Sequence, residues 1–199
     1  PHFVAEINAI AEALIVPESG DAGGHFSTLA QNFIANLLVK LVTETKGRDA
    51  TLFDLFDLLA LSITELDDLF NNMAVSEHPN TRVQRIIRQA GNWWGGIDER
   101  QQGNILTTVN KNLAFLKDWS IEPVVSASSF DMRQLRGGRL TIYLSLPFTY
   151  VKTMRPWLRV MLTMSLLALL SEATEVKPPV LFLIDEWVAG VGRLDLIER

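Results

Sequence analysis

Near the end of the chain, five consecutive apolar residues lead directly into two carboxylates. The run from Val180 to Ile184 shows no alternation of polar and apolar residues. This is typical of a strand covered on both faces, as in a parallel sheet flanked by helices. Asp185 and Glu186 follow at once, and open α/β sheets bind ligands at the carboxyl ends of their strands. The stretch predicts a buried strand that ends in a candidate site, although two solvated acids after such a strand would give the same pattern.

A second strand and a helix precede this run. Residues 140–146 form a mostly apolar stretch between a glycine-containing turn at 136–138 and Pro147, which indicates a strand. A largely apolar helix is predicted from about 152 to 172. Strand, helix and strand over 140–184 predict a βαβ unit with parallel strands and a right-handed crossover.

The first part of the chain has the apolar spacing of helices. Val4, Ile7, Ala11 and Leu14 fall on one helical face. Two sequences of the form Ser/Thr-x-x-Asp/Glu, at 51–54 and 62–65, predict capping boxes. The predicted helices span residues 3–15, 26–42, 52–60, 63–74, from Asn80 to the Trp93–Gly96 stretch, and 98–119. We therefore predict an all-α domain over 1–128 and a different, α/β unit over 129–199.

Composition narrows the possible classes. The chain has 199 residues, 48% of them hydrophobic and 21% charged, which indicates a globular protein with a substantial core. The formal charge of -5 argues against nucleic-acid binding over the whole surface, though a local basic face is compatible with it. There is no cysteine, hence no disulfide framework. The apolar run 160–170 is shorter than the roughly 20 residues that cross a bilayer, so we expect this chain to be soluble.

The chain resembles a known family over most of its length, most strongly after about residue 128. The segment PPVLFLIDEWVAGVGRLDLIER, residues 178–199, resembles the Walker B segment of the coupling proteins of type IV secretion systems, the TraG/TraD-type conjugative DNA-transfer ATPases. Residues 129–144 resemble the family's segment that leads into the preceding strand. A weaker likeness covers Pro1 to Val4 and the helix after residues 24–26.

The resemblance implies a fold and an activity. In this family an all-α domain is inserted into a RecA-like motor domain, and the chain then returns to supply the Walker B strand. The expected fold is thus mainly α: a helical bundle followed by a short parallel βαβ piece of a RecA-like P-loop motor. Asp185 would help hold the Mg2+ of ATP, and Glu186 would orient or deprotonate the attacking water. We expect ATP and Mg2+ in the full-length parent and neither bound to this chain alone.

A phosphate loop is not found in this sequence. Gly20, Gly23 and Gly24 are followed by His25, whereas a P-loop ends in Gly-Lys-Ser/Thr. Phosphoryl transfer needs the phosphate cradle, the magnesium and the positioned water together. We therefore expect the parent to be an ATP-driven motor and this chain by itself to hydrolyse nothing.

Two charged stretches are candidates for recognition. The stretch from residue 49 to residue 77 contains seven acidic residues and no Lys or Arg. This favours partner docking through the helices at 52–74. Arg82, Arg85 and Arg88 recur every third residue on the next helix. With Lys111, Trp93 and Trp94 they suggest single-strand binding, with arginines on phosphates and an indole stacked on a base. Adjacent tryptophans at a helix end are also typical core anchors, so both alternatives stay open.

The resemblance further implies partners and a location. The family recruits DNA, a relaxase complex or secreted proteins to the other type IV secretion components at the cytoplasmic side of the bacterial inner membrane. Its motors act as hexamers and carry a membrane anchor, which we expect outside this chain; the chain itself could be monomeric. Two alternatives remain: a helical docking module without nucleotide function, and a metal-dependent hydrolase built on Asp185 and Glu186. His2, His25 and His78 lack metal-ligand spacing.

Overall fold

Helices make up most of the computed structural model, which describes residues 3–17, 24–44, 49–137, 140–170 and 179–185. No part of these ranges is assigned as a β-strand. The helices are α1 (Phe3–Leu14), α2 (His25–Glu44), α3 (Leu52–Leu59), α4 (Ile63–Ala74), α5 (Thr81–Gly95), α6 (Glu99–Asn112), α7 (Glu122–Val125), α8 (Phe148–Val151) and α9 (Arg155–Leu170), with 3-10 turns η2 (Ala114–Lys117) and η3 (Met132–Gly137).

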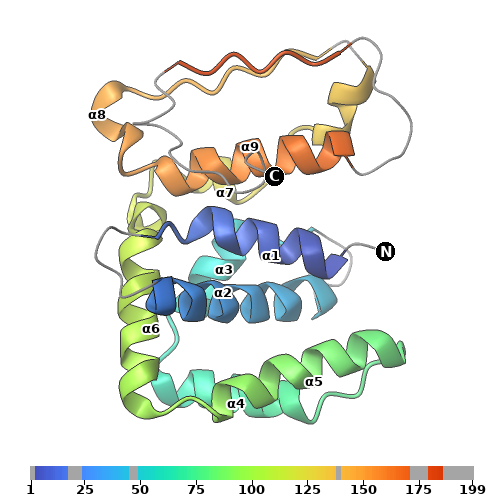
Figure 1. Cartoon of the computed structure of the whole chain (residues 1–199), viewed down its shortest axis with the longest axis vertical. Helices are drawn as coiled ribbons and strands as arrows, with labels where there is room; N and C mark the ends of the chain where they lie inside the picture. Colours follow the sequence, from blue (N-terminus) through green and yellow to red (C-terminus); the bar gives the residue numbers. More distant parts are fainter. Residues whose placement is uncertain (1–2, 18–23, 45–48, 138–139, 171–178, 186–199) are drawn as a thin grey trace.

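The helix α2 lies at the centre of the bundle. It contacts α1, α3, α5 and α6. Figure 1 shows α4 and α5 as a hairpin on one side of α2, α1 on the other, and α6 running across their ends. The predicted helical character is confirmed, and the first five helices begin and end within two residues of the predicted positions.

Side-chain caps fix where these helices begin. The predicted capping boxes are both present. The backbone nitrogen of Thr51 donates to the Asp54 carboxylate at 2.8 Å, and that of Ser62 donates to Glu65 at 2.8 Å. Each carboxylate satisfies a donor that the helix itself leaves without a partner. Asn80 and Asp98 cap α5 and α6 in the simpler way, by accepting from backbone N–H groups in the first turn.

An aromatic cluster joins α2 to the α4–α5 hairpin. Phe33, Phe70 and Trp94 are each at most 1% exposed, and their ring centroids lie 5.0–5.8 Å apart. The Trp94 indole N–H donates to the Asp67 carboxylate at 2.7 Å, so the one polar atom of the ring is satisfied. At Gly91 the two helices of the hairpin come so close that an added Cβ would lie 2.3 Å from the backbone nitrogen of Ala74.

The end of α1 is held by three other helices. Arg159 of α9 is 4% exposed, and its guanidinium donates to the carbonyls of Ala13 at 3.0 Å and Glu12 at 3.2 Å. Gln31 of α2 donates to the carbonyl of Ile15, and Asn112 of α6 accepts from the backbone of the next residue. The two Arg159 contacts satisfy carbonyls that a helix leaves unpaired at its C-terminus. The Arg159 hydrogen bonds attach α9 to α1. In addition, α9 shares a continuous apolar core with the bundle.

Two predicted helices are shorter than expected. The helix predicted to reach residue 119 ends at Asn112, because a 3-10 turn follows that places Phe115 and Leu116 in the core. The helix predicted from 152 begins at Arg155, after the separate turn of α8. Pro156 has no N–H to donate and therefore occupies the first turn of α9. No described helix, α9 included, combines the length and apolarity needed to cross a membrane.

The two predicted strands are extended but form no sheet. In Figure 1 residues 140–147 and 179–185 run in the same direction above α9. Exposure alternates along both, and Phe182 and Ile184 pack toward Leu162 of α9. Leu181 and Leu183 point outward and are 85% and 91% exposed. The expectation of a run covered on both faces is wrong for the described residues, because α9 covers only one face.

Candidate functional site

The candidate acid Asp185 lies at the end of the second extended segment. Its neighbours Phe182 and Ile184 are anchored on α9, and Asp185 itself is exposed. Figure 1 shows the segment 179–185 ending on the same side of this layer as α8, which follows the first extended segment. Residues two apart in an extended segment share a face, so Asp185 lies on the same exposed face as Leu181 and Leu183. Glu186 lies outside the described residues.

The described part of the chain offers one possible magnesium ligand at this end. Its His, Asp and Glu side chains nowhere gather in a group of three that could hold a metal. Magnesium bound with a nucleotide takes one or two carboxylates, and phosphate oxygens and water complete its shell. A single exposed Asp185 fits that role. The hydrolase alternative requires Glu186 as well, which lies outside the described residues.

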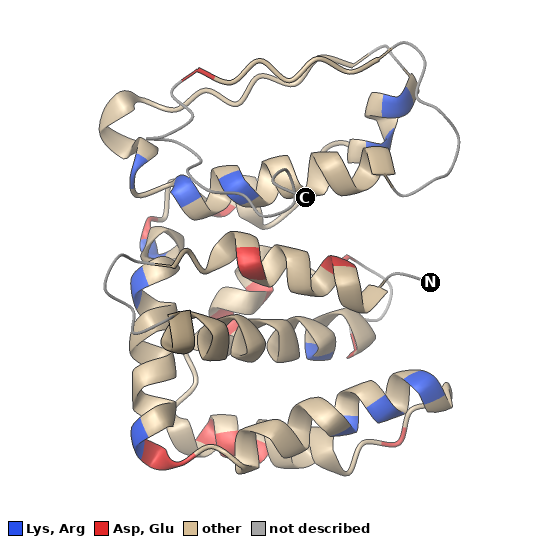
Figure 2. Ribbon diagram, viewed as in Figure 1, with Lys and Arg blue, Asp and Glu red and all other residues tan. Residues whose placement is uncertain are grey.

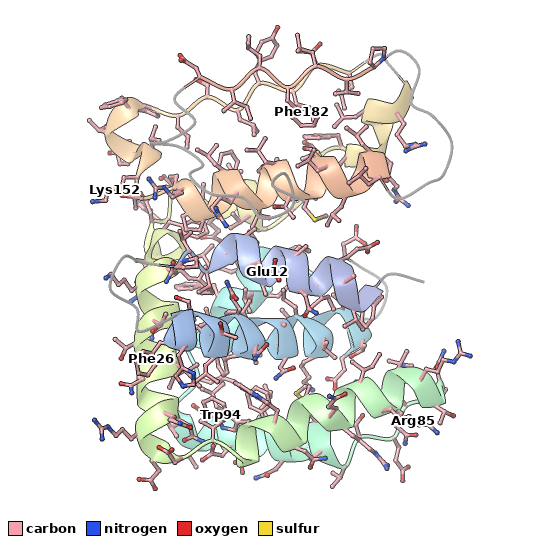
Figure 3. The ribbon with its side chains drawn as sticks, in the orientation of Figure 1. Glu12, Phe26, Arg85, Trp94, Lys152 and Phe182 are labelled. Carbon is pink, nitrogen blue, oxygen red and sulfur yellow. The ribbon has the colours of Figure 1, made fainter. Side chains whose placement is uncertain are left out.

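The arginines of α5 form a basic stripe, which we define as Arg82, Arg85 and Arg88. All three are exposed, and Figure 2 shows them toward the free end of the α4–α5 hairpin. Arg88 donates to the carbonyl of Ser76 at 2.9 Å. Within the described residues, Arg82 and Arg85 have no ion pair, and Figure 3 shows Arg85 pointing away from the bundle.

The other predicted nucleic-acid contacts do not join the stripe. Lys111 is in the last turn of α6, and α6 runs across α5 from its opposite end. At 1.5 Å per residue, Lys111 and Arg82 lie at the far ends of two arms of about 20 Å each. Trp94 is in the core (Figure 3), where its ring stacks on Phe70 and lies tilted against Phe33. Trp93 is half-buried against the same core.

The predicted acidic surface is partly taken up by structural contacts. Asp54 and Glu65 close the capping boxes, and Asp67 accepts from Trp94. Hydrogen bonds from the Ser62 side chain and backbone hold the pKa of Glu65 below its ordinary value. Asp57, Asp68 and Glu77 remain exposed. The acidic helices thus present fewer carboxylates to a partner than the sequence count indicates.

A cleft between α1, α2 and α5 was missed by the sequence reasoning. It has a volume of about 880 Å³ and lies beside the first residue of the basic stripe. Val4, predicted to face inward, is 42% exposed here, and Val42 at the end of α2 is 48% exposed. Val83 and Ile86 line the opposite wall. The only sequence signal is an apolar stripe that continues to the very ends of two helices.

Comparisons with known proteins place the chain in a family. The family model described as "Type IV secretory system Conjugative DNA transfer" matches residues 2–199. Two curated Escherichia coli proteins named "Conjugal transfer protein TraG" are 22% and 21% identical to the chain over 209 aligned positions, which cover 98% of it. The chain spans about a third of their length, 32% and 33%. No solved structure matches it. Because the family match extends over nearly every residue, the chain belongs to the type IV secretory system conjugative DNA transfer family.

Proposed function

We propose that this chain is the recognition part of a coupling protein, which recruits DNA–relaxase complexes or protein substrates to a type IV secretion system and energises their transfer. The family match over residues 2–199 is the observation that carries the proposal. The relatives named for conjugal transfer are about three times as long as this chain. Most of the described chain is a helical bundle, so the recognition role falls to α1–α6.

The surface favours protein docking over a nucleic-acid track. Non-specific single-strand binding uses a continuous basic groove with exposed aromatic rings. Here the stripe of three arginines is short, Lys111 lies on another helix, and Trp94 is buried. A nucleic-acid contact at the stripe would be one element of a larger complex.

We also propose that residues 140–184 belong to a nucleotide-binding motor of the RecA type. The two extended segments run in the same direction over the crossover helix α9, and their exposure alternates as it does in strands. The outward side chains of Tyr143, Leu181 and Leu183 are 85–91% exposed. An apolar face of this kind is ordinarily covered by a second layer, which further chain of the complete protein would supply. In that setting Asp185 would contact the magnesium that accompanies ATP, while Glu186 would orient water.

Direct binding tests the recognition role. The chain, labelled and at equilibrium, is titrated with a purified relaxase bound to its origin DNA, and with that DNA alone. We expect saturable binding to the complex with a dissociation constant of about 1 μM, typical of a transient interface.

Salt separates the two modes of binding. Affinity for the relaxase complex should change little between 50 and 200 mM salt, whereas binding through phosphates would fall steeply. If the complete protein bound the complex and this chain did not, recognition would lie elsewhere in the protein.

A further inference from the structure

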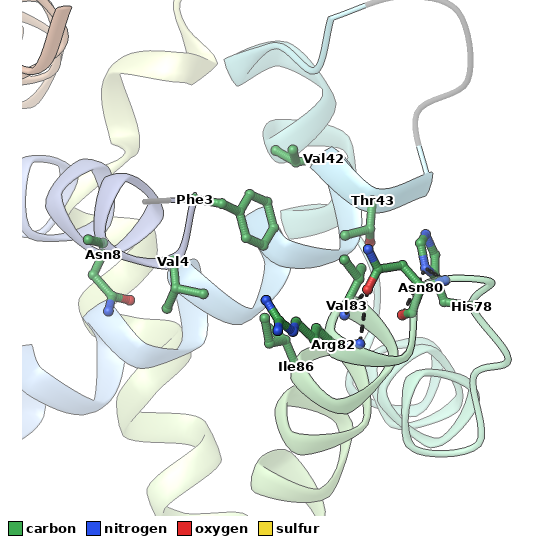
Figure 4. A pocket seen from close by; sticks show the side chains of 11 residues that line it. Phe3, Val4, Asn8, Val42, Thr43, His78, Asn80, Arg82, Val83 and Ile86 are labelled. Atoms are coloured by element: carbon green, nitrogen blue, oxygen red, sulfur yellow. Dashed lines mark hydrogen bonds between the residues drawn. The ribbon is translucent and has the colours of Figure 1, made fainter. Parts of the chain in front are cut away.

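The cleft between α1, α2 and α5 is lined mainly by apolar side chains. Phe3 and Val4 come from the first turn of α1, and Val42 comes from the last turn of α2. Val83 and Ile86, one turn apart on α5, complete the apolar wall (Figure 4). A pocket of about 880 Å³ is within the size range of pockets that bind ligands.

The rim of the cleft carries an available positive charge. Arg82 is one of the lining residues and is exposed, and Arg85 is on the following turn. In the part of the chain that the structure describes, no carboxylate is paired with either arginine. The N-terminus of α5 is capped, since the Asn80 side chain accepts from the backbone N–H groups of Arg82 at 3.0 Å and of Val83 at 3.3 Å. The cap places Arg82 and Val83 in the first turn of α5, so that the charge and one part of the apolar wall lie side by side.

We propose that this cleft docks an acidic, amphipathic segment of a partner protein. Apolar side chains of that segment would enter between Val4, Val42 and Ile86, and a carboxylate beside them would contact Arg82. Helix-in-groove recognition of this kind uses apolar anchors spaced three or four residues apart. The proposal rests on the recognition role above and adds the place and the chemistry of one contact.

The lining of the cleft distinguishes this occupant from a nucleic acid. A phosphate backbone needs several cations along its path, whereas Arg82 is the one arginine or lysine among the lining residues. Aliphatic walls match leucine, isoleucine or phenylalanine side chains, and burying them contributes favourably to binding. The charge on the stripe then selects acidic over basic segments.

A displayed library of random twelve-residue peptides, selected against this chain, tests the proposal. We expect the enriched peptides to combine Asp or Glu with apolar residues at helical spacing. The strongest of them is then synthesised with a fluorescent label, and its affinity is measured by anisotropy. Arg82→Glu and Val42→Asp should each weaken binding about tenfold or more, because one reverses the rim charge and the other places a charge in the apolar wall.

Matched controls are available outside the cleft. Arg100 and Val124 are exposed on α6 and α7, and neither lines the cleft. Arg100→Glu and Val124→Asp should leave the affinity within about twofold. Circular dichroism of all four variants verifies that the helices are intact, so that a loss of binding reports the cleft.

Three outcomes would overturn the proposal. The enriched peptides could be basic or absent, the affinity could be unchanged in both cleft variants, or a labelled single-stranded 20-mer could bind in a manner that depends on Arg82 and Val42, which would make the cleft a nucleic-acid site. If any of these results were obtained while the chain still bound the relaxase complex, this docking site would be refuted and the proposed recognition role would stand. If the chain bound the acidic peptide at the cleft but did not bind the relaxase complex, the proposed recognition of transfer substrates would be contradicted instead.

Discussion

Replacing Gly91 with alanine is expected to lower the free energy of unfolding by about 3 kcal/mol or more. An added Cβ would lie 2.3 Å from the nitrogen of Ala74 and 2.5 Å from the carbonyl oxygen of Phe70, both backbone atoms of α4. Backbone atoms cannot turn aside as a side chain does, so α4 and α5 would have to separate. Their separation would open the stacking of Phe70 on Trp94.

The expected loss at Gly91 opposes the intrinsic preference of a helix. Alanine in a helix interior is favoured over glycine by about 1 kcal/mol. Gly103 in α6 has nothing within 4 Å of its added Cβ, and Gly103→Ala should therefore be neutral or stabilising. Urea unfolding followed by circular dichroism measures both. Equal or greater stability of Gly91→Ala would show that the hairpin does not pack as closely as described.

Trp94→Ala is expected to destabilise the chain by about 3–5 kcal/mol. The change leaves a large cavity beside Phe33 and Phe70. It also removes the indole N–H that donates a hydrogen bond to the Asp67 carboxylate. Trp94→Phe keeps an aromatic ring in the core but still deprives Asp67 of its partner, at a cost of about 1–3 kcal/mol.

The matched control is Trp119, which is 88% exposed. Trp119→Ala should change the free energy of unfolding by no more than about 0.5 kcal/mol. Guanidinium titration with tryptophan fluorescence or circular dichroism compares the three variants. Similar stabilities for Trp94→Ala and Trp119→Ala would contradict the assignment of Trp94 to the core, and would return it to the list of surface candidates.

The helices of the bundle could be predicted because their signals are local. Apolar spacing indicated α1 to α6, and the Thr51 and Ser62 boxes fixed the starts of α3 and α4. The end of α6 could not be predicted in this way. The helix α6 ends at Asn112, whose side chain accepts a hydrogen bond from the backbone of Val16, ninety-six residues earlier. No local sequence pattern reveals such a partner.

The layer around Asp185 shows a different limit. A continuous apolar run indicates a strand with two covered faces, but it does not say which chain segments cover them. Here α9 covers Phe182 and Ile184, while Leu181 and Leu183 are exposed. The cleft was missed because apolar residues at the ends of helices look like core residues in the sequence. Val4 and Val42 continue the apolar faces of their helices, and only the arrangement of α1, α2 and α5 shows that nothing in the described residues covers them.

The most direct test of the account is ATP turnover by the complete coupling protein carrying Asp185→Asn. Magnesium-assisted charge stabilisation is worth several kcal/mol, so turnover should fall about 100-fold or more, while binding of the relaxase complex is retained. Glu99→Gln, at an exposed acid on α6 outside the acidic stretch 49–77, should leave both unchanged. Undiminished ATP turnover in Asp185→Asn would contradict the placement of these extended segments in a nucleotide-driven motor.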